Sequence, residues 1–238
     1  MDKLDVLKQW VAQSKRIVFF GGAGVSTESG IPDFRGVDGL YRQKFAYPPE
    51  TIISRSFYDR DPAYFYRFYR EKMLPLGFEP NVTHQVLAQW EAEGKLLAVV
   101  TQNIDGLHQK AGSQRVLELH GSVLRNYCTA CGKFHSAEFI RDSADIPKCT
   151  CGGVVKPDVV LYEESLDADT IEGSVAAIEK ADLLIVGGTS LTVYPAAGLI
   201  NYYRGDRLVL INRDSTPFDN RADLVLHESL GTVFSALF

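Results

Sequence analysis

Short, nearly continuous apolar runs recur along the chain, and each is followed by glycine or polar residues. Runs of this kind are typical of strands that are buried on both faces of a parallel sheet. The predicted strands lie at 17–20, 96–101, 115–119, 181–188, 207–212 and 222–227.

Helical patterns fall between several of these runs. Leu4, Leu7 and Val11 recur at the spacing of one helix face, which predicts an amphipathic helix over 2–14. Three further helices are predicted at 83–93, 169–180 and 195–204. The alternation of strands and helices predicts an α/β fold with a doubly wound, Rossmann-like parallel sheet.

Two segments interrupt this alternation. Residues 37–78 are rich in aromatic side chains with prolines as breaks, and residues 126–156 hold every cysteine. We predict that these segments form a smaller inserted domain, helical in one part and a zinc ribbon in the other, with a ligand crevice between it and the sheet. The predicted Rossmann-like domain then consists of 1–36, 79–125 and 157–238.

Composition and charge narrow the possible functions. The chain has 238 residues, of which 45% are hydrophobic and 23% charged, so it can form a buried core, and global disorder, collagen-like repeats and coiled coils are excluded. Its net charge of −5 disfavours nucleic acid as the main partner and is compatible with a cationic peptide. No apolar run approaches a membrane span, so we expect a cytoplasmic protein with no membrane association.

The four cysteines follow the pattern Cys128-x2-Cys131-x17-Cys149-x-Cys151. Four thiolates within one short stretch are typical of a closed tetrahedral zinc site rather than of a disulfide framework. Because the protein supplies all four ligands, we predict one structural Zn²⁺, with a set of free thiols as the alternative. The single residue between Cys149 and Cys151 is an unusual but feasible spacing.

A glycine-rich loop, Gly21-Gly22-Ala23-Gly24, follows the first predicted strand. Such glycines let backbone amides approach a pyrophosphate, and a helix starting there would favour the anion. The dinucleotide pattern is only partial, because Thr27 takes the place of its third glycine, and the loop is not a P-loop. Asp33-Phe34-Arg35 adds an acid, a ring and a cation suited to a charged aromatic ligand. The alternative is a core phenylalanine beside a surface ion pair.

Small or polar residues also follow the other predicted strands. Since the carboxyl ends of parallel strands meet at one edge of a sheet, they are expected to converge on the ligand crevice. Histidine suits proton transfer near neutral pH, so His120 is a candidate base, with a structural role as the alternative. The converging residues are Gln102, Asn103, Asp105, His120, Gly187, Gly188, Thr189, Ser190 and Asn212.

Together these motifs resemble the sirtuins, the NAD-dependent protein-lysine deacylases, in their compact bacterial form. The resemblance covers nearly the whole chain and keeps the family's order of motifs. The matching stretches are GAGVSTESGIPDFRG, TQNIDGLH, LELHGS, the four-cysteine motif, KPDVVLYEE at 156–164, GTSLTVYPAAGL and LINRD.

The resemblance implies that NAD is the co-substrate and that nicotinamide, O-acyl-ADP-ribose and free lysine are the products. It makes His120 the catalytic base, with Asn103 and Asp105 as further catalytic residues, Asp105 taking the nicotinamide carboxamide. The implied NAD contacts are Gly22, Ala23, Gly24, Thr27, Asp33, Phe34, Arg35, Gln102, Asn103, Ile104, Asp105, His120, Gly188, Thr189, Ser190 and Asn212.

The resemblance also implies the peptide and acyl sites. An acylated peptide would bind as an extended strand along Val159, Val160, Leu161 and Tyr162, opposite residues near 191–193. Sirtuins that prefer acidic acyl groups carry Tyr-x-x-Arg in the aromatic helix.

This chain offers Tyr69-x-x-Lys72 in that place, and Tyr64-x-x-Arg67 about one helical turn out of frame. Lysine lacks arginine's bidentate fork, so we expect mainly deacetylation, with removal of acidic acyl groups as a secondary activity.

Three alternatives remain at this point. The same scaffold could perform mono-ADP-ribosyl transfer or NAD hydrolysis, which the peptide-pairing strand at 159–162 disfavours. The chain could instead be a zinc-ribbon module that binds NAD without turnover, which His120 with Asn103 and Asp105 argues against. A nucleic-acid role for the zinc module has little support, because no basic stripe runs along it. We expect a monomer.

Overall fold

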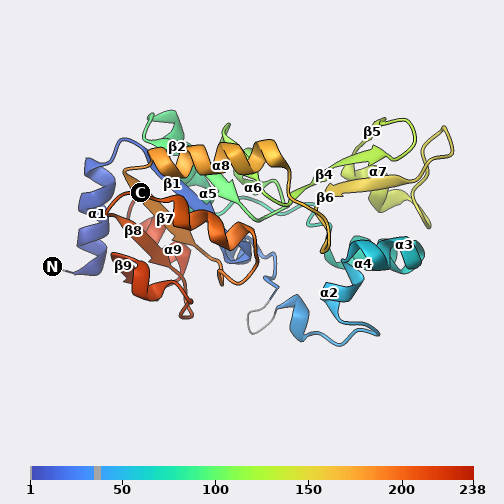
Figure 1. The fold of residues 1–238 in the computed structure, drawn as a ribbon, viewed down its shortest axis with the longest axis horizontal. Coiled ribbons are helices and arrows are strands. Elements are labelled where there is room, and N and C mark those ends of the chain that lie inside the picture. Colours follow the sequence, from blue (N-terminus) through green and yellow to red (C-terminus); the bar gives the residue numbers. More distant parts are fainter. Residues whose placement is uncertain (1, 35–38) are drawn as a thin grey trace.

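The computed structural model describes residues 2–34 and 39–238 (Figure 1). Within them, six strands form one sheet in the order β3-β2-β1-β7-β8-β9, and all pairings in it are parallel. This order confirms the predicted doubly wound α/β fold, because the chain runs from β1 out to β3 and returns to the other side of β1 through β7. The strands are β1 (Ile17–Gly21), β2 (Leu96–Thr101), β3 (Val116–Glu118), β7 (Leu183–Gly187), β8 (Leu208–Ile211) and β9 (Leu224–Leu226).

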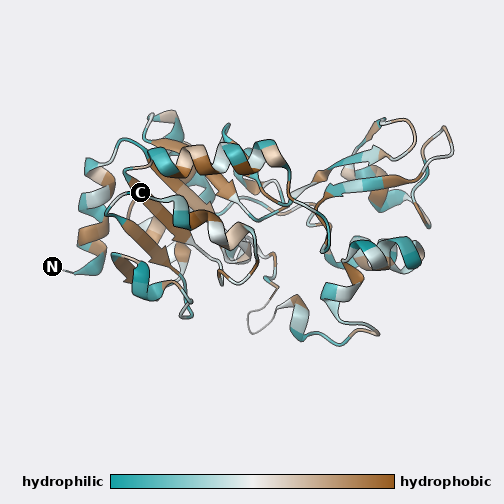
Figure 2. Ribbon diagram, viewed as in Figure 1, coloured by the Kyte–Doolittle hydropathy of each residue, from teal (hydrophilic) through white to brown (hydrophobic). Residues whose placement is uncertain are grey.

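Alternate side chains of these strands enter two cores on opposite faces of the sheet. Ile17 and Phe19 of β1 join one buried cluster, and Val18 and Phe20 join the other. Figure 2 shows the strands of this sheet as strongly hydrophobic, whereas the helices covering it alternate between hydrophobic and hydrophilic residues. The first face is covered by α1 (Lys3–Gln13), α5 (Val82–Ala92) and α9 (Leu230–Ser235), and the second by α8 (Ala168–Lys180).

Three of the four predicted helices are confirmed, as α1, α5 and α8. The fourth, predicted at 195–204, is a 3-10 helix over Ala196–Tyr202. Its buried side chains are Ala196, Ala197, Leu199 and Ile200, and the tighter helix brings residues three apart to the same side. The pattern therefore predicted the buried segment correctly and its helix type wrongly.

The helix start predicted after the glycine loop is also wrong. Two 3-10 turns, Ala23–Val25 and Thr27–Ser29, stand where a regular helix was expected. Three-residue turns align too few peptide dipoles to favour an anion as a long helix does. The argument from a helix N-terminus therefore does not apply to this loop.

A second sheet and a group of helices lie beside the parallel sheet, on the right in Figure 1. We call them the small module. Its antiparallel sheet has the order β5-β4-β6, and its third hydrophobic cluster combines side chains from α2, α3 and α4 with side chains from β4, β6 and α7. Its elements are α2 (Pro49–Ile52), α3 (Arg55–Arg60), α4 (Pro62–Lys72), β4 (Gly121–Cys128), β5 (Phe134–His135), α7 (Ala137–Asp142) and β6 (Val155–Val159).

Aromatic side chains dominate this third cluster. Phe65 stacks on Tyr69 with ring centroids 5.6 Å apart, and Tyr58 meets Phe65 edge-on at 5.0 Å. Many of the predicted aromatics therefore pack the module. The predicted domain boundaries stay a prediction, and the antiparallel sheet itself begins at Gly121 and ends at Val159.

The remaining elements are short. They are α6 (Leu107–Lys110) and 3-10 turns at Leu40–Arg42 and Asp219–Arg221. Among the described residues, no helix has both the length and the apolar character needed to cross a membrane.

Candidate functional site

A cleft of about 640 Å³ opens at the carboxyl ends of β1, β2, β7 and β8 and reaches the small module. It lies where the strand order reverses between β1 and β7, the usual position of a ligand crevice in such sheets. All predicted NAD contacts that are described line this cleft, together with Tyr69 and the segment 159–162. The remaining predicted NAD contact, Arg35, lies outside the described residues.

The glycine loop after β1 packs against the loop after β7. Gly22 N and Gly24 N donate to the carbonyls of Gly187 (3.2 Å) and Gly188 (2.8 Å). A Cβ on Gly24 would lie 2.8 Å from Gly188 Cα, and Gly188 itself has a φ of +61°. Glycines are therefore needed for this close approach, and their two amides are used between the loops rather than pointed at a phosphate. Their contact with NAD stays a prediction.

A buried chain of hydrogen bonds joins the loops after β1 and β2. Asn103 Nδ2 donates to Ser26 Oγ at 3.1 Å, and the Ser26 hydroxyl donates to Asp105 Oδ2 at 2.7 Å. Leu107 N donates to the other oxygen, Oδ1, of Asp105 at 2.9 Å. Both predicted catalytic side chains after β2 are thus fixed in place. Ser26 was missed by sequence reasoning, although its place in the loop after the first strand was a usable signal.

The Asp105 carboxyl has a perturbed acidity. Burial raises its pKa above the ordinary value, and the Ser26 hydroxyl and the Leu107 amide oppose that rise by stabilising the charged form. A buried carboxylate of this kind has acceptor positions suited to a polar amide. The geometry is compatible with the predicted contact to a carboxamide.

His120 follows β3 and is partly buried in the cleft. Its Nδ1 lies 3.0 Å from the Gln102 carbonyl oxygen, which can only accept, so Nδ1 carries the proton in the neutral ring. Nε2 then holds the lone pair. Burial lowers the pKa of His120, although the bond to Gln102 opposes this shift. A neutral, oriented imidazole can act as a general base.

The loops after β2, β7 and β8 carry further polar groups. Gln102 Nε2 donates to Thr189 Oγ1 at 3.0 Å, and the Ser190 and Thr192 hydroxyls are 2.8 Å apart. Asn212 Nδ2 donates to the Asp214 carbonyl at 2.8 Å within its own turn. Hydroxyl and amide groups at these positions suit ribose and adenine, as the sequence predicts.

The other residues predicted to contact NAD also line the cleft. Thr27 Oγ1 donates to the Gly24 carbonyl at 3.0 Å, and the Ile104 carbonyl accepts from Val123 N at 3.0 Å. Phe34 meets the Tyr41 ring edge-on at 5.5 Å and packs against the third cluster. Phe34 therefore has both a packing contact and a place in the cleft. Ala23 and Asp33 also line the cleft.

The expected acyl pocket lies on α4. Tyr69 is 1% exposed, and its hydroxyl has no hydrogen-bond partner within the described residues. Burial raises the pKa of this hydroxyl. Lys72 also lines the cleft, where its Nζ pairs with Glu71 at 3.0 Å. Tyr64 and Arg67, the alternative frame, are not among the residues that line the cleft, and the Arg67 guanidinium lies over the Tyr64 ring at 4.7 Å.

The predicted peptide-pairing segment continues β6. Only Val159 belongs to that strand, and the next three residues leave it. Val160 N donates to the His120 carbonyl at 3.0 Å, and Tyr162 N donates to the Ile53 carbonyl at 3.1 Å. Leu161 N donates to Glu164 Oε2 at 2.9 Å. The segment is thus bonded to the loop of the candidate base on one side and to the small module on the other.

The four cysteines converge on one point of the small module. Their Sγ atoms all lie within 4.8 Å of one another, and individual pairs are 3.4–3.8 Å apart. Tetrahedral zinc with bonds of about 2.3 Å requires sulfur–sulfur distances of about 3.8 Å. The cluster therefore fits one zinc ion, and four thiolates leave no open ligand position. The unusual spacing of the second pair does not prevent this convergence.

Comparisons with known proteins agree with this geometry. The sequence model of the Sir2 family matches residues 22–195. The NAD-dependent protein deacetylase of Clostridium perfringens is 59% identical over 236 residues, which cover 98% of this chain and 97% of the relative. The enzyme of the same name from Clostridium acetobutylicum is 58% identical over 241 residues, which cover 100% and 98%.

Solved structures give the same result. A Sir2 variant with deacetylated p53 peptide and 3′-O-acetyl-ADP-ribose superposes with a TM-score of 0.92 at 37% identity, covering 99% of this chain and 97% of that chain. A Sir2 complex with p53 peptide and NAD⁺ superposes with a TM-score of 0.86 at 38% identity, covering 99% and 96%.

Proposed function

This chain belongs to the Sir2 family, and from that premise we propose that it is an NAD-dependent protein-lysine deacetylase. The reaction consumes NAD, the acetyl-lysine and one water, and its products are nicotinamide, O-acetyl-ADP-ribose and free lysine. The relatives named above carry this activity in their names, and one matching structure contains both a deacetylated peptide and an acetylated ADP-ribose.

The observation that carries the proposal is the neutral His120 beside the bonded chain of Asn103, Ser26 and Asp105 in one cleft. A base and an oriented polar chain at one crevice are what a reaction on a sugar hydroxyl requires. A binding module without turnover would have no need for an imidazole fixed in this tautomer.

The cleft fits NAD in size and chemistry. Its volume of about 640 Å³ is within the range of about 300–1,000 Å³ that is common for small-molecule sites. When bound, NAD supplies an ADP-ribose that accepts the acyl group as nicotinamide leaves. We assign the adenosine half to Thr189, Ser190 and Asn212, and the nicotinamide half to Asn103 and Asp105.

His120 performs the proton transfer in this proposal. Its Nε2 takes the proton from a ribose hydroxyl, and the Gln102 carbonyl keeps the ring oriented throughout because it bonds the opposite nitrogen. Asp105 holds the nicotinamide carboxamide, and Ser26 holds Asp105. Hydrogen bonds that are already formed need no rearrangement when the substrates enter.

The zinc ion has a structural role in this proposal. Cys128, Cys131, Cys149 and Cys151 would hold it with no position left for water or substrate. We also propose a cytoplasmic location for the protein.

Substrates are acetylated lysines in peptides or proteins, bound as an extended strand along 159–162. We also propose that the protein acts as a monomer.

A direct experiment tests the proposal. The protein is incubated with an acetyl-lysine peptide with and without NAD, and mass spectrometry follows the peptide and the nucleotide products. Loss of the acetyl group with formation of O-acetyl-ADP-ribose is expected only with NAD. Free ADP-ribose or an ADP-ribosylated protein, with the peptide intact, would contradict it and favour NAD hydrolysis or ADP-ribosyl transfer.

A variant assigns the base. His120→Ala should lower kcat by about 10²–10⁴-fold, the usual contribution of a general base. The rise in Tm caused by added NAD should remain, because that shift reports binding rather than turnover. Unchanged kcat in His120→Ala would remove His120 from the mechanism.

A further inference from the structure

The segment that follows β6 is tied to the small module by its backbone. Tyr162 N donates to the Ile53 carbonyl at 3.1 Å, and Arg55 N donates back to the Tyr162 carbonyl at 2.9 Å. Ser54 and Tyr162 form an isolated parallel bridge between these bonds. Residues 53–55, where α2 ends and α3 begins, therefore hold by backbone bonds the segment that we expect to pair with the peptide.

Glu163, the next residue, is also bonded to the small module, and its backbone has an unfavourable conformation. Its φ is +75°, in the left-handed region that glycine favours and that a glutamate rarely adopts. Its side chain offsets this strain, because both carboxylate oxygens accept bonds from Ser56. Oε2 accepts from Ser56 N at 2.8 Å, and Oε1 accepts from Ser56 Oγ at 2.9 Å.

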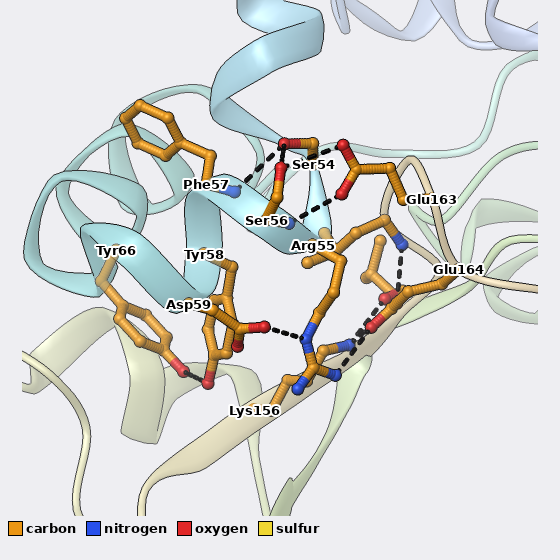
Figure 3. A network of polar contacts seen from close by, with 12 residues as sticks. Ser54, Arg55, Ser56, Phe57, Tyr58, Asp59, Tyr66, Lys156, Glu163 and Glu164 are labelled. Atoms are coloured by element: carbon orange, nitrogen blue, oxygen red, sulfur yellow. Dashed lines mark hydrogen bonds and ion pairs between the residues drawn. The ribbon is translucent and has the colours of Figure 1, made fainter.

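Figure 3 shows the two neighbouring glutamates directed to different partners. Glu164 meets two cations, Arg55 Nη1 and Lys156 Nζ, both at 3.3 Å. Glu163 meets only the neutral donors of Ser56 among the described residues within ion-pair distance. The attachment of Glu163 therefore depends on hydrogen-bond geometry, and an amide of the same shape could replace its carboxylate.

The place of Glu163 in the cleft makes its bonds to Ser56 relevant to peptide binding. Glu163 and segment 159–162 line the same cleft, and Val160 is bonded to the loop of His120. A peptide that pairs through its main chain gains affinity only where the receiving backbone holds the right position. Loosening residue 163 would shift that backbone while leaving the NAD loops after β1, β7 and β8 untouched.

We propose that Glu163 and Ser56 form a latch that sets the position of segment 159–162 for the acyl-lysine peptide. Glu163 is then a positioning residue for peptide binding, and it acts without touching the reacting atoms. This inference rests on the proposed function and adds to it a residue that governs affinity for the peptide but not for NAD.

The test compares three variants with one control. Glu163→Ala removes the latch and keeps the strain, Glu163→Gly removes both, and Glu163→Gln keeps an acceptor for Ser56 N and a donor for Ser56 Oγ. Glu172→Ala removes an exposed glutamate of α8 that does not line the cleft. Each protein is assayed for KM of an acetyl-lysine peptide, KM of NAD, kcat and Tm, and for Kd of a fluorescent acetyl-lysine peptide without NAD.

We expect Glu163→Ala and Glu163→Gly to raise the peptide KM and Kd by about fivefold, the size of losing one or two such bonds. The KM of NAD, kcat and the Tm shift with NAD should stay near the unmodified values. Glu163→Gln should recover most of the peptide affinity, and Glu172→Ala should not change it.

Two outcomes would overturn the latch. Unchanged peptide KM and Kd in a folded Glu163→Ala protein would show that the backbone bonds alone position the segment. A Glu163→Gln protein as weak as Glu163→Ala would show that charge rather than the bonded shape matters. Failure of the proposed function is seen separately, because the unmodified protein would then not deacetylate the peptide at all.

Discussion

The clusters beside the parallel sheet and the cluster of the small module are built from different side chains. The first two consist mainly of aliphatic residues from strands with helices packed on each face. The third combines phenylalanine and tyrosine rings with Cys128 and Cys149. Although α4 has eleven residues, two other helices of the module are short, with four residues in α2 and six in α3.

Helices of that length are marginal on their own in water. The sheet can therefore form a core from its strand pattern alone, whereas the small module depends on rings, side-chain bonds and a metal. The polar chain that we propose for catalysis is anchored on the sheet, and the segment that we propose to pair with the peptide is anchored on the module. Changes to the two regions should separate stability from binding.

The largest effect is expected from a zinc ligand. Cys128→Ser should prevent zinc binding, which in small zinc modules contributes on the order of 10 kcal/mol to folding. We expect loss of the bound metal by mass spectrometry, loss of deacetylation, and unfolding confined to the small module. Hydrogen exchange should show protection retained in β1, β2 and β7.

Lys133→Ala, which changes an exposed residue between the ligands, is the control. A Cys128→Ser protein with full activity and no zinc would refute the dependence of the module on metal.

A buried pair of histidines should make the stability of the sheet region sensitive to acid. The rings of His84 and His108 lie tilted to each other with centroids 4.7 Å apart, and neither His108 nitrogen has a hydrogen-bond partner within the described residues. Burial lowers the pKa of His84 to about 4, and burial together with His84 lowers that of His108 well below its ordinary value.

The unfolded chain therefore binds more protons than the native protein between pH 6.5 and about 4. Stability should fall as pH falls through this window, by about 1.4 kcal/mol per pH unit for each histidine. His108→Phe should halve that slope in urea titrations at pH 6.5, 5.5 and 4.5. An equal slope in both proteins would mean that the pair is not neutral in the native state.

The difference between the regions also explains what could be predicted from sequence. Continuous apolar runs predict buried strands directly, so the sheet and its crevice followed from the pattern. The cysteine spacing predicted the metal cluster for the same reason, since ligand type and spacing are local. The position of Glu163 at positive φ and the role of Ser26 are not local, because each depends on a partner far along the chain.

Two helix errors have a similar origin. A pattern of apolar residues marks burial, but 3-10 and α-helices differ in how the segment meets its neighbours. The 3-10 turns at Ala23–Val25 and Thr27–Ser29 and the 3-10 helix after Pro195 contact other loops and the sheet, and such contacts are not visible in the apolar pattern of the segment itself.

An intermediate effect is expected from Ser26, whose hydroxyl both donates and accepts a hydrogen bond. Ser26→Ala removes the donor to Asp105 and the acceptor for Asn103, leaving two buried groups without their partner. Such a loss costs about 1–3 kcal/mol, so kcat/KM for NAD should fall about 10- to 100-fold. Steady-state kinetics at several NAD concentrations measures it.

Ser29→Ala is a nearby control, since its hydroxyl contacts Asn81 instead. Comparable losses in Ser26→Ala and Ser29→Ala would mean that the whole loop, rather than the bonded chain, sets the activity.

The smallest effect is expected from Tyr69, whose hydroxyl is as buried as that of Ser26 but bonds to nothing among the described residues. Removing an unpaired buried hydroxyl leaves no partner orphaned, so Tyr69→Phe should keep the free energy of unfolding within about 1 kcal/mol of that of the unmodified protein, or raise it. Deacetylation should change less than about threefold, because an acetyl group is neutral and small.

Removal of a succinyl group tests whether the Tyr69 hydroxyl recognises the acyl group. Lys72 lines the same cleft, and a carboxylate there would give the Tyr69 hydroxyl its missing acceptor. A selective rise in KM for the succinyl peptide, measured beside the acetyl peptide, would assign the hydroxyl to acyl recognition. Equal KM changes for both peptides would assign Tyr69 to packing alone, and the contrast with Ser26 would then separate a used hydroxyl from an unused one.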